Sequence, residues 1–372
     1  MESGRKGKKS KVSALSVSAG VPRADPVNKQ AFDLSRKKRK QVLTATEYAK
    51  GIFSHDPVVL SQAITIIESS REDHNQLAQD IIGLCLPRSG NSIRVGITGV
   101  PGVGKSTFIE ELGGVISSSG KKLAVLAIDP SSVRSGGSIM GDKTRMETLA
   151  SDPNAFIRPS PSSGSLGGVA RKTRETIILC EAAGFDILFI ETVGVGQSEV
   201  AVHSMVDFFL LLMLPGSGDE LQGIKRGIME MADLIAITKA DGDNLEKAER
   251  AMVDFRNALH LFPPGETGWI PKVSSCSAYT KKGLNEIWIA ILEFVALNRA
   301  NGWFEKTRNS QSKYWMYQTI EEKLKSQFYK NELIQKELSL LEKKVLNMET
   351  SPFLAAQEIL NKYYKNQNKR TK

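Results

Sequence analysis

Short apolar runs and stretches of helical periodicity alternate through the middle of this 372-residue chain. The apolar runs predict β-strands, and the segments between them carry apolar residues at the three- and four-residue spacing of helices. Strands that are apolar throughout are typical of a mostly parallel sheet covered by helices on both faces. The pattern predicts an α/β fold with strands at residues 93–98, 123–128, 187–190, 208–214 and 234–238, and a short one at Val273.

Helical patterns flank this region on both sides. On the amino side, residues 44–47 have the form of a capping box, and Asp56 followed by Pro57 has the form of a helix start. We therefore expect a small helical extension over residues 42–92. Its apolar positions at helical spacing are Leu60, Ala63, Ile64 and Ile67.

On the carboxyl side, the chain becomes helical and charged beyond residue 300. An apolar seam repeats there with 4-3-4-3 spacing, over a length too short to define a coiled coil. Two interpretations are open: the seam packs on its own domain, or it packs on a second copy of the chain. Its members are Ile334, Leu338, Leu341, Val345 and Met348.

The net charge of +9 belongs to the amino-terminal segment. Residues 1–40 hold 12 Lys and Arg against 3 Asp and Glu, whereas residues 41–372 are balanced. A run of basic residues such as 36–40 can contact nucleic acid or an acidic partner, although such tails are more often solvated. We expect a disordered basic tail at residues 1–41 on a neutral folded body, and the tail leaves nucleic-acid binding open.

The cysteine content favours a reducing compartment, and the hydropathy gives no sign of a membrane segment. Cys85, Cys180 and Cys276 have no C-x-x-C spacing, which argues against disulfides and against a cysteine-based metal site. The basic amino terminus is not followed by the apolar core of a secretory signal, and the longest apolar run, 208–214, is too short to span a membrane. We expect a cytoplasmic protein, or a mitochondrial one in a eukaryote, with no membrane partner.

A glycine-rich motif of the form G-x-x-x-x-G-K-[S/T] lies between the strand expected at 93–98 and a helical segment. Its glycines allow backbone N–H groups to surround phosphate oxygens, and the helix start adds a positive dipole end. Lys105 is expected to reach the β- and γ-phosphates, and the Ser106 hydroxyl to bind Mg²⁺. The motif predicts a nucleotide site made by Gly99, Val100, Pro101, Gly102, Val103, Gly104, Lys105, Ser106 and Thr107.

A glycine- and serine-rich loop follows the second expected strand and begins with Asp129. It also contains Asp142 and Arg145, a composition that suits a switch region beside a phosphate site. Carboxylates can hold Mg²⁺ directly or through water, and an arginine can stabilise charge on a transferred phosphoryl group. For Asp129 alone, capping of the following turn is an equal alternative.

The strand expected at 187–190 is followed by Glu191, with Gly194 three residues further on. In NTP hydrolases an acid at this place orients Mg²⁺, and the glycine N–H senses the γ-phosphate. Gln197 has a side chain suited to positioning water, although an exposed polar loop contains similar residues. We expect catalytic roles for Lys105, Arg145, Glu191 and Gln197, and a metal site made by Ser106, Asp129, Asp142 and Glu191.

The segment at the end of the strand at 234–238 is expected to bind the base of the nucleotide. Asp241 can accept from guanine N1–H and N2–H₂, donors that adenine lacks at those positions, and the stem of Lys239 can lie along the ring. Thr238 stands where asparagine is usual in this motif. A second contact is expected near residues 275–278, where a backbone N–H meets guanine O6. These positions favour GTP over ATP, with a base site made by Thr238, Lys239, Asp241, Ser277 and Ala278.

Taken together, these stretches resemble the MeaB/ArgK-type GTPases that accompany adenosylcobalamin-dependent methylmalonyl-CoA mutase. The resemblance extends over residues 45–300 and includes GVPGVGKSTFIEELG, AIDPSSVRSGGSIMGDKTRM, RPSPSSGSLGGVA, FIETVGVGQSE and TKADGDN. It implies a P-loop GTPase domain over residues 93–298, with the amino-terminal helices as one extension. A second helical extension, residues 299–372, is implied to form a homodimer.

The resemblance also assigns a role to LPGSGDELQGIK, which by itself reads as a turn into a helix. In the family this segment is a mobile loop that signals the nucleotide state to the mutase. The implied signalling residues are Asp219, Glu220, Gln222 and Lys225.

The implied function is that of a chaperone that binds and hydrolyses GTP with Mg²⁺ and has no bound redox cofactor. It would gate adenosylcobalamin delivery to a B12-dependent acyl-CoA mutase, and protect or reactivate that enzyme. One alternative is a metal-inserting GTPase of the nickel-enzyme maturation type, which needs a Cys/His cluster that the four scattered histidines do not suggest. The other is a small-molecule or protein kinase, for which the sequence offers no second substrate pocket.

Overall fold

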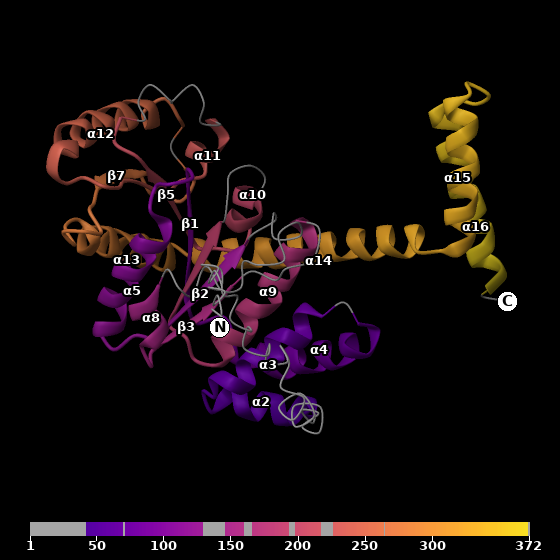
Figure 1. The fold of residues 1–372 in the computed structure, drawn as a ribbon, viewed down its shortest axis with the longest axis horizontal. Coiled ribbons are helices and arrows are strands. Elements are labelled where there is room, and N and C mark those ends of the chain that lie inside the picture. The colour runs from indigo at the N-terminus through magenta and orange to yellow at the C-terminus, as the bar shows by residue number, and fades with distance from the viewer. Residues whose placement is uncertain are drawn as a thin grey trace, which may run out of the picture. The chain divides into compact units, whose positions relative to one another are not determined.

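Seven parallel strands form one sheet in the computed structural model, which describes residues 42–69, 71–128, 146–159, 166–192, 198–216, 226–263 and 265–370 (Figure 1). The strand order is β3-β2-β4-β1-β5-β6-β7, so the strand that precedes the glycine-rich motif lies in the middle. Every neighbouring pair is parallel. The strands are β1 (Ile93–Gly99), β2 (Leu123–Ile128), β3 (Ala155–Arg158), β4 (Ile187–Thr192), β5 (Phe208–Met213), β6 (Leu234–Ile237) and β7 (Lys272–Ser275).

The expected α/β class and parallel sheet are confirmed, and six of the strands lie where the sequence predicts them. The strand that the sequence analysis missed is β3. It has only 4 residues, lies at the edge of the sheet and includes Arg158, so it lacks the apolar run of a central strand.

Three aspartates align the strands at the amino edge of the sheet. Asp186, Asp207 and Asp233 each stand immediately before a strand, namely β4, β5 and β6. Their carboxylates accept from the backbone N–H groups of Lys122, Arg94 and Phe209, at 2.9, 2.8 and 2.8 Å. In each case the donor belongs to the neighbouring strand or directly precedes it, so a side chain continues the backbone ladder beyond its end.

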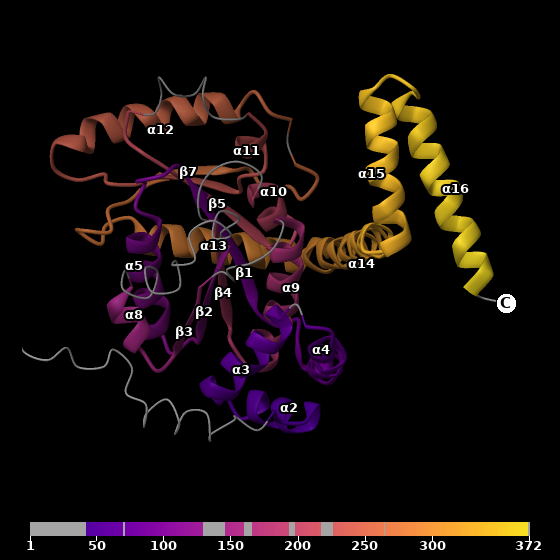
Figure 2. The same cartoon turned by 45° about the vertical axis from the view of Figure 1, so that its right-hand side comes forward.

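Helices cover both faces of the sheet, as Figure 2 shows from a second side. On one face, α5, α8 and α13 bury the main apolar core together with inward residues of β1, β4 and β5. On the other face, α9 and α10 pack against β1, β2 and β4. The helices are α5 (Lys105–Ser118), α8 (Glu147–Ser151), α9 (Leu166–Ala182), α10 (Ser198–His203), α11 (Arg226–Glu230), α12 (Leu245–Leu259) and α13 (Leu284–Ala300).

The amino-terminal helices α2 (Ala45–Phe53), α3 (Pro57–Glu68) and α4 (Glu72–Cys85) pack on one another and on α9. Both expected helix starts are present. Thr44 and Glu47 form a reciprocal capping box, and the Asp56 carboxylate accepts from the backbone N–H groups of Val58 and Val59. The helices therefore begin at the residues whose side chains satisfy their first N–H groups.

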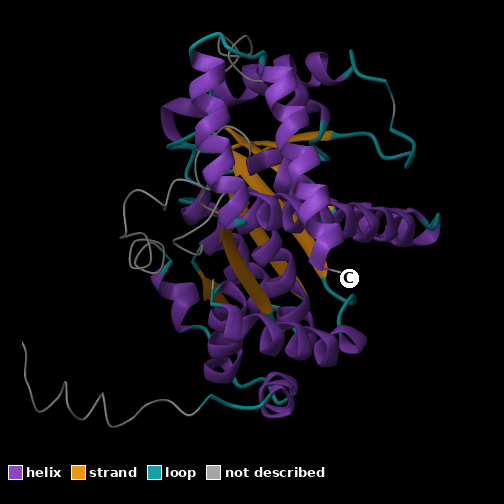
Figure 3. Ribbon diagram, turned by 90° about the vertical axis from the view of Figure 1, so that its right-hand side faces the viewer, coloured by secondary structure: helices purple, strands orange, loops and turns teal. Residues whose placement is uncertain are grey.

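At the carboxyl end, the long helix α14 (Trp303–Tyr329) leads into a hairpin of α15 (Glu332–Leu346) and α16 (Pro352–Arg370), as Figures 1 and 3 show. The predicted apolar seam packs within the chain, against α16. The exception is Met348, which lies beyond the end of α15, has a φ of 57° and is 92% exposed. The cluster is separate from the core of the sheet and consists of Phe328, Ile334, Leu338, Leu341, Val345, Ala355, Ile359 and Tyr363.

Cys85, Cys180 and Cys276 are all buried and unpaired, and burial raises the pKa of the Cys85 thiol to about 11. No helix among the described residues is both long and apolar enough to cross a membrane.

Candidate active site

The glycine-rich motif forms a tight turn between β1 and α5, at the carboxyl edge of the sheet. A side chain at Gly99 would place its Cβ 2.4 Å from the Leu212 carbonyl oxygen, so only glycine fits beside β5. Gly102 and Gly104 have φ angles of 78° and 91°, which other residues rarely adopt. No side chain caps α5, so its first backbone N–H groups face the loop and are available to phosphate oxygens.

The Lys105 ammonium lies inside this loop. Its Nζ donates to the carbonyl oxygens of Gly99 at 2.7 Å and Val100 at 3.4 Å. Burial lowers the pKa of Lys105, and the nearby charges of Glu191 and Glu199 oppose that shift. A half-buried cation held by loop carbonyls is a suitable partner for the β- and γ-phosphate oxygens.

Glu191 lies near the end of β4. The neighbours of β4 in the sheet are β1, which precedes the glycine-rich motif, and β2, which precedes the glycine- and serine-rich loop. Glu191 is opposite Ile97 of β1 and Ala127 of β2 in the sheet register, and it is buried. The hydroxyl groups of Thr98 and Thr192 lie 2.8 Å apart and join the same two strand ends. The sequence analysis did not identify this threonine pair, because hydroxyl residues at strand ends are common.

The residues near Lys105 have the chemistry that Mg²⁺ requires. Ser106 supplies a half-buried hydroxyl at the start of α5, and Glu191 supplies a carboxylate. Oxygen ligands of this kind, completed by phosphate and water, suit Mg²⁺. Within the described ranges, no group of three or more His, Cys, Asp and Glu side chains could hold a metal ion.

The predicted base-reading segment, residues 238–241, follows β6 and is hydrogen-bonded directly to the phosphate loop, residues 99–107. The Thr238 hydroxyl donates to the Val103 carbonyl at 2.8 Å, and its backbone N–H donates to Met213 O at 2.8 Å. Lys239 adopts a φ of 54°, and its Nζ donates to the Gly102 carbonyl at 2.8 Å. The threonine that departs from the usual asparagine thus still connects the two halves of the site.

Asp241 is held in place by the segment that follows β7. The Ser277 hydroxyl donates to the Asp241 carboxylate and itself accepts from the Thr280 N–H at 3.0 Å. The backbone adds a bond from Ala240 N to Cys276 O at 3.0 Å. Ser277 is fully buried, and Ala278 follows it at the surface of the site. The structure therefore brings together the predicted base residues from two separate strand ends.

Eight of the predicted residues lie outside the described part of the chain. They are Asp129, Asp142, Arg145, Gln197, Asp219, Glu220, Gln222 and Lys225. The described part of the site consequently consists of the phosphate loop, the start of α5, the end of β4 and the two predicted base-reading segments after β6 and β7.

A parallel sheet with this loop after its central strand, together with an aspartate at the place predicted for guanine recognition, is the arrangement of a P-loop GTPase. The family described as methylmalonyl-CoA mutase-associated GTPase MeaB matches residues 60–333. The chain is 46% identical over 289 residues to the GTPase ArgK of Escherichia coli, covering 78% of this chain and 87% of that protein. The chain belongs to the MeaB family of GTPases.

Two further relatives support this assignment. The mouse protein named methylmalonic aciduria type A homolog, mitochondrial, is 46% identical over 323 residues, which is 84% of this chain and 78% of that protein. A crystal structure described as LAO/AO transport system kinase superposes with a TM-score of 0.71 at 35% identity, covering 87% of this chain and all of that one.

Proposed function

We propose that this GTPase is a chaperone of an adenosylcobalamin-dependent acyl-CoA mutase, with methylmalonyl-CoA mutase as the first candidate. Cycles of GTP binding and hydrolysis would gate cofactor delivery to the mutase and protect or reactivate it. The observation that carries the proposal is the extent of the family match. It begins inside α3 and ends inside α15, so the likeness includes helices on both sides of the nucleotide-binding core.

Hydrolysis would proceed by in-line attack of water on the γ-phosphate. Lys105 and the N–H groups at the start of α5 would stabilise charge on the phosphoryl oxygens. Mg²⁺ would be held by Ser106 and oriented by Glu191, with Asp129 and Asp142 as further proposed ligands. Arg145 and Gln197 complete the proposed catalytic set, and no redox cofactor is required for this reaction.

The partner would read the nucleotide state through Asp219, Glu220, Gln222 and Lys225. The place of action we propose is the cytoplasm, or the mitochondrion if the source is a eukaryote. The basic segment 1–41 has no assigned role in this scheme.

We also propose that the chain is a homodimer through α15 and α16. Apolar side chains remain exposed there, among them Leu346 at 81% and Phe353 at 85%. Leu346 borders a cavity of about 380 Å³ that both helices line, with Leu338 and Ala356 among its other walls. A Phe353→Glu variant should become monomeric in multi-angle light scattering, whereas Lys323→Glu on α14 should remain a dimer.

The function is tested by GTP hydrolysis with and without an adenosylcobalamin-dependent acyl-CoA mutase, and with ATP as the control nucleotide. The proposal expects slow turnover of GTP alone and faster turnover when the mutase is added. Turnover that is indifferent to every such mutase would overturn the partner and leave the GTPase. Transfer of labelled γ-phosphate to an acceptor other than water would favour a kinase.

A further inference from the structure

One face of α14 contacts the short segment that joins α10 to β5. Arg308, Gln311 and Trp315 follow one another at spacings of three and four residues, so they lie on the same side of the helix. Trp315 Nε1 donates to the Ser204 carbonyl at 2.9 Å, and Gln311 Nε2 donates to the Val206 carbonyl at 2.7 Å. About two turns of α14 therefore hold residues 204–207 through polar contacts.

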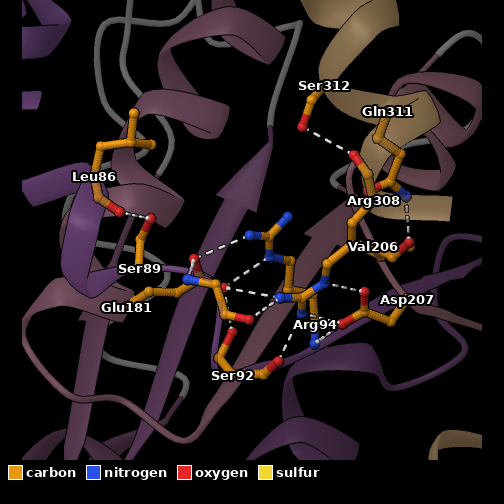
Figure 4. Close-up of polar contacts among 11 residues, drawn as sticks. Leu86, Ser89, Ser92, Arg94, Glu181, Val206, Asp207, Arg308, Gln311 and Ser312 are labelled. Atoms are coloured by element: carbon orange, nitrogen blue, oxygen red, sulfur yellow. Dashed lines mark hydrogen bonds and ion pairs between the residues drawn. The ribbon is translucent and has the colours of Figure 1, made fainter. Parts of the chain in front are cut away.

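Arg308, the first of these three residues, binds to the amino edge of the sheet (Figure 4). Arg308 donates to both carboxylate oxygens of Asp207, at 2.8 and 2.7 Å, and to the Ser92 carbonyl at 2.6 Å. Asp207 in turn accepts from the N–H of Arg94 in β1. The amino-terminal part of α14 is thus fixed to the sheet, while Gln311 and Trp315 reach beyond it toward α10.

Helix α10 connects this segment to the nucleotide site. It begins at Ser198, seven residues after Glu191, and it packs against β1 and β4. The packing is close, because a side chain on Gly96 of β1 would place its Cβ 2.8 Å from Val202. A shift of the Glu191 end of β4 would therefore be passed on, through its packing with α10, to the residues that α14 holds.

A cavity of about 580 Å³ is bordered by both helices, and also by α13 and by the segments that precede β5 and β6. Val200 and His203 of α10 form part of its wall, and Gln311 and Tyr314 of α14 form another part. The open space beside Val200 and His203 leaves room for α10 to shift. The oxygen Oε1 of Gln311 is buried here and has no hydrogen-bond partner in the described chain.

We propose that Gln311 and Trp315 are positioning residues for GTP hydrolysis, which fix α10 through the carbonyl groups of Val206 and Ser204. Because α14 continues into α15 and α16, the same contacts couple the nucleotide state to the carboxyl-terminal hairpin. The proposal rests on the GTPase activity and does not depend on a mutase partner.

The first test replaces Trp315 by phenylalanine, which keeps an aromatic ring and removes the N–H donor. We expect kcat for GTP to fall about three- to tenfold while KM changes less than about twofold, as for the loss of one hydrogen bond that orients the reacting state. The matched control is Trp288→Phe, because Trp288 is half-buried in α13 and its indole makes no hydrogen bond within the described part of the chain. Unchanged kcat in Trp315→Phe, or an equal loss in the control, would overturn the proposal.

A second measurement follows Trp315 itself. In a variant whose other tryptophans, Trp269, Trp288 and Trp303, are phenylalanine, emission should differ between GDP and a non-hydrolysable GTP analogue. Adding Gln311→Met should reduce that difference at least about twofold. If the triple variant does not fold, the same coupling can be measured by comparing hydrogen exchange of residues 311–320 of the unmodified chain in the two nucleotide states. Identical signals in the two nucleotide states would contradict the coupling.

Discussion

The Thr238 hydroxyl donates to the Val103 carbonyl over 2.8 Å, and this bond joins the base-reading segment to the phosphate loop. Lys239 makes a parallel connection to the Gly102 carbonyl. Both bonds are made between protein groups, so the protein itself holds the two halves of the site in register. Preorganisation of this kind reduces the ordering cost of binding.

Replacing Thr238 by valine should weaken GTP and GDP binding alike, by about fivefold, because the isosteric side chain leaves the Val103 carbonyl without its hydroxyl donor. Titration with a fluorescent guanine nucleotide measures both dissociation constants. Thr238→Ser keeps the hydroxyl and serves as the control. A loss confined to GTP would contradict a role in holding the loops together.

Asp241 should determine which base is accepted. In Asp241→Asn an amide N–H₂ faces the N1–H and N2–H₂ donors of guanine, whereas the O2 atom of xanthine would accept from it. We expect GTP affinity to fall by about 100-fold or more and XTP to become the better ligand, because a charged hydrogen bond is lost and two donor groups then repel each other. Competition titrations with GTP, XTP and ATP measure the change.

Ser277→Ala offers a graded comparison at the same site. It leaves the Asp241 carboxylate in place but removes the hydroxyl that orients it, so the affinity for GTP should fall only about three- to tenfold, with no increase for XTP. Should wild-type protein bind ATP as tightly as GTP, the assignment of Asp241 to guanine recognition would be wrong.

The parts of the fold that the sequence predicted are those with local signals. The glycine motif follows the buried strand at 93–98, whose residues are mostly apolar or small. The motif and the strand can each be recognised from consecutive residues. The capping box at Thr44 is likewise contained in four residues. The edge strand β3 gives no such signal, because it is short and only partly buried.

Contacts between distant segments could not be predicted from the sequence, for a different reason. The apolar seam of α15 was visible, but whether α16 or a second chain covers it depends on a turn of the backbone. Gln311 and Trp315 are polar and aromatic residues on a charged helix and resemble a solvated face. Their partners are main-chain carbonyls, which every residue possesses and no sequence pattern reveals.

Glu181 should contribute strongly to stability. It is buried, and its carboxylate accepts from Arg94 Nε and Nη2, both at 2.9 Å, and from the Ser92 hydroxyl at 2.6 Å. Glu181→Gln leaves the buried guanidinium of Arg94 without its counter-charge, which typically costs about 3–5 kcal/mol. Urea denaturation at pH 7 should show that loss, and the exposed pair variant Glu246→Gln should show almost none.

The contribution of Glu181 should also depend on pH. Burial raises the pKa of Glu181, but the charge and hydrogen bonds of Arg94, with those of Ser92 and Arg308, outweigh it and lower the pKa below 4.5. The stabilisation is therefore present above the unfolded value and is lost as the pH falls through the folded one. The difference in free energy of unfolding between wild type and Glu181→Gln should shrink below pH 4.5, and a constant difference would contradict this assignment.

The hairpin of α15 and α16 should unfold independently of the GTPase core, because its apolar cluster is separate from that of the sheet. Leu341 is 4% exposed within the cluster, whereas the adjacent Leu340 is 57% exposed. Leu341→Ala should cost about 2–4 kcal/mol and speed hydrogen exchange across residues 332–370, while exchange in β1 stays unchanged. Leu340→Ala should leave the hairpin protected. Faster exchange in β1 of the Leu341 variant would instead mean that hairpin and core unfold as one unit.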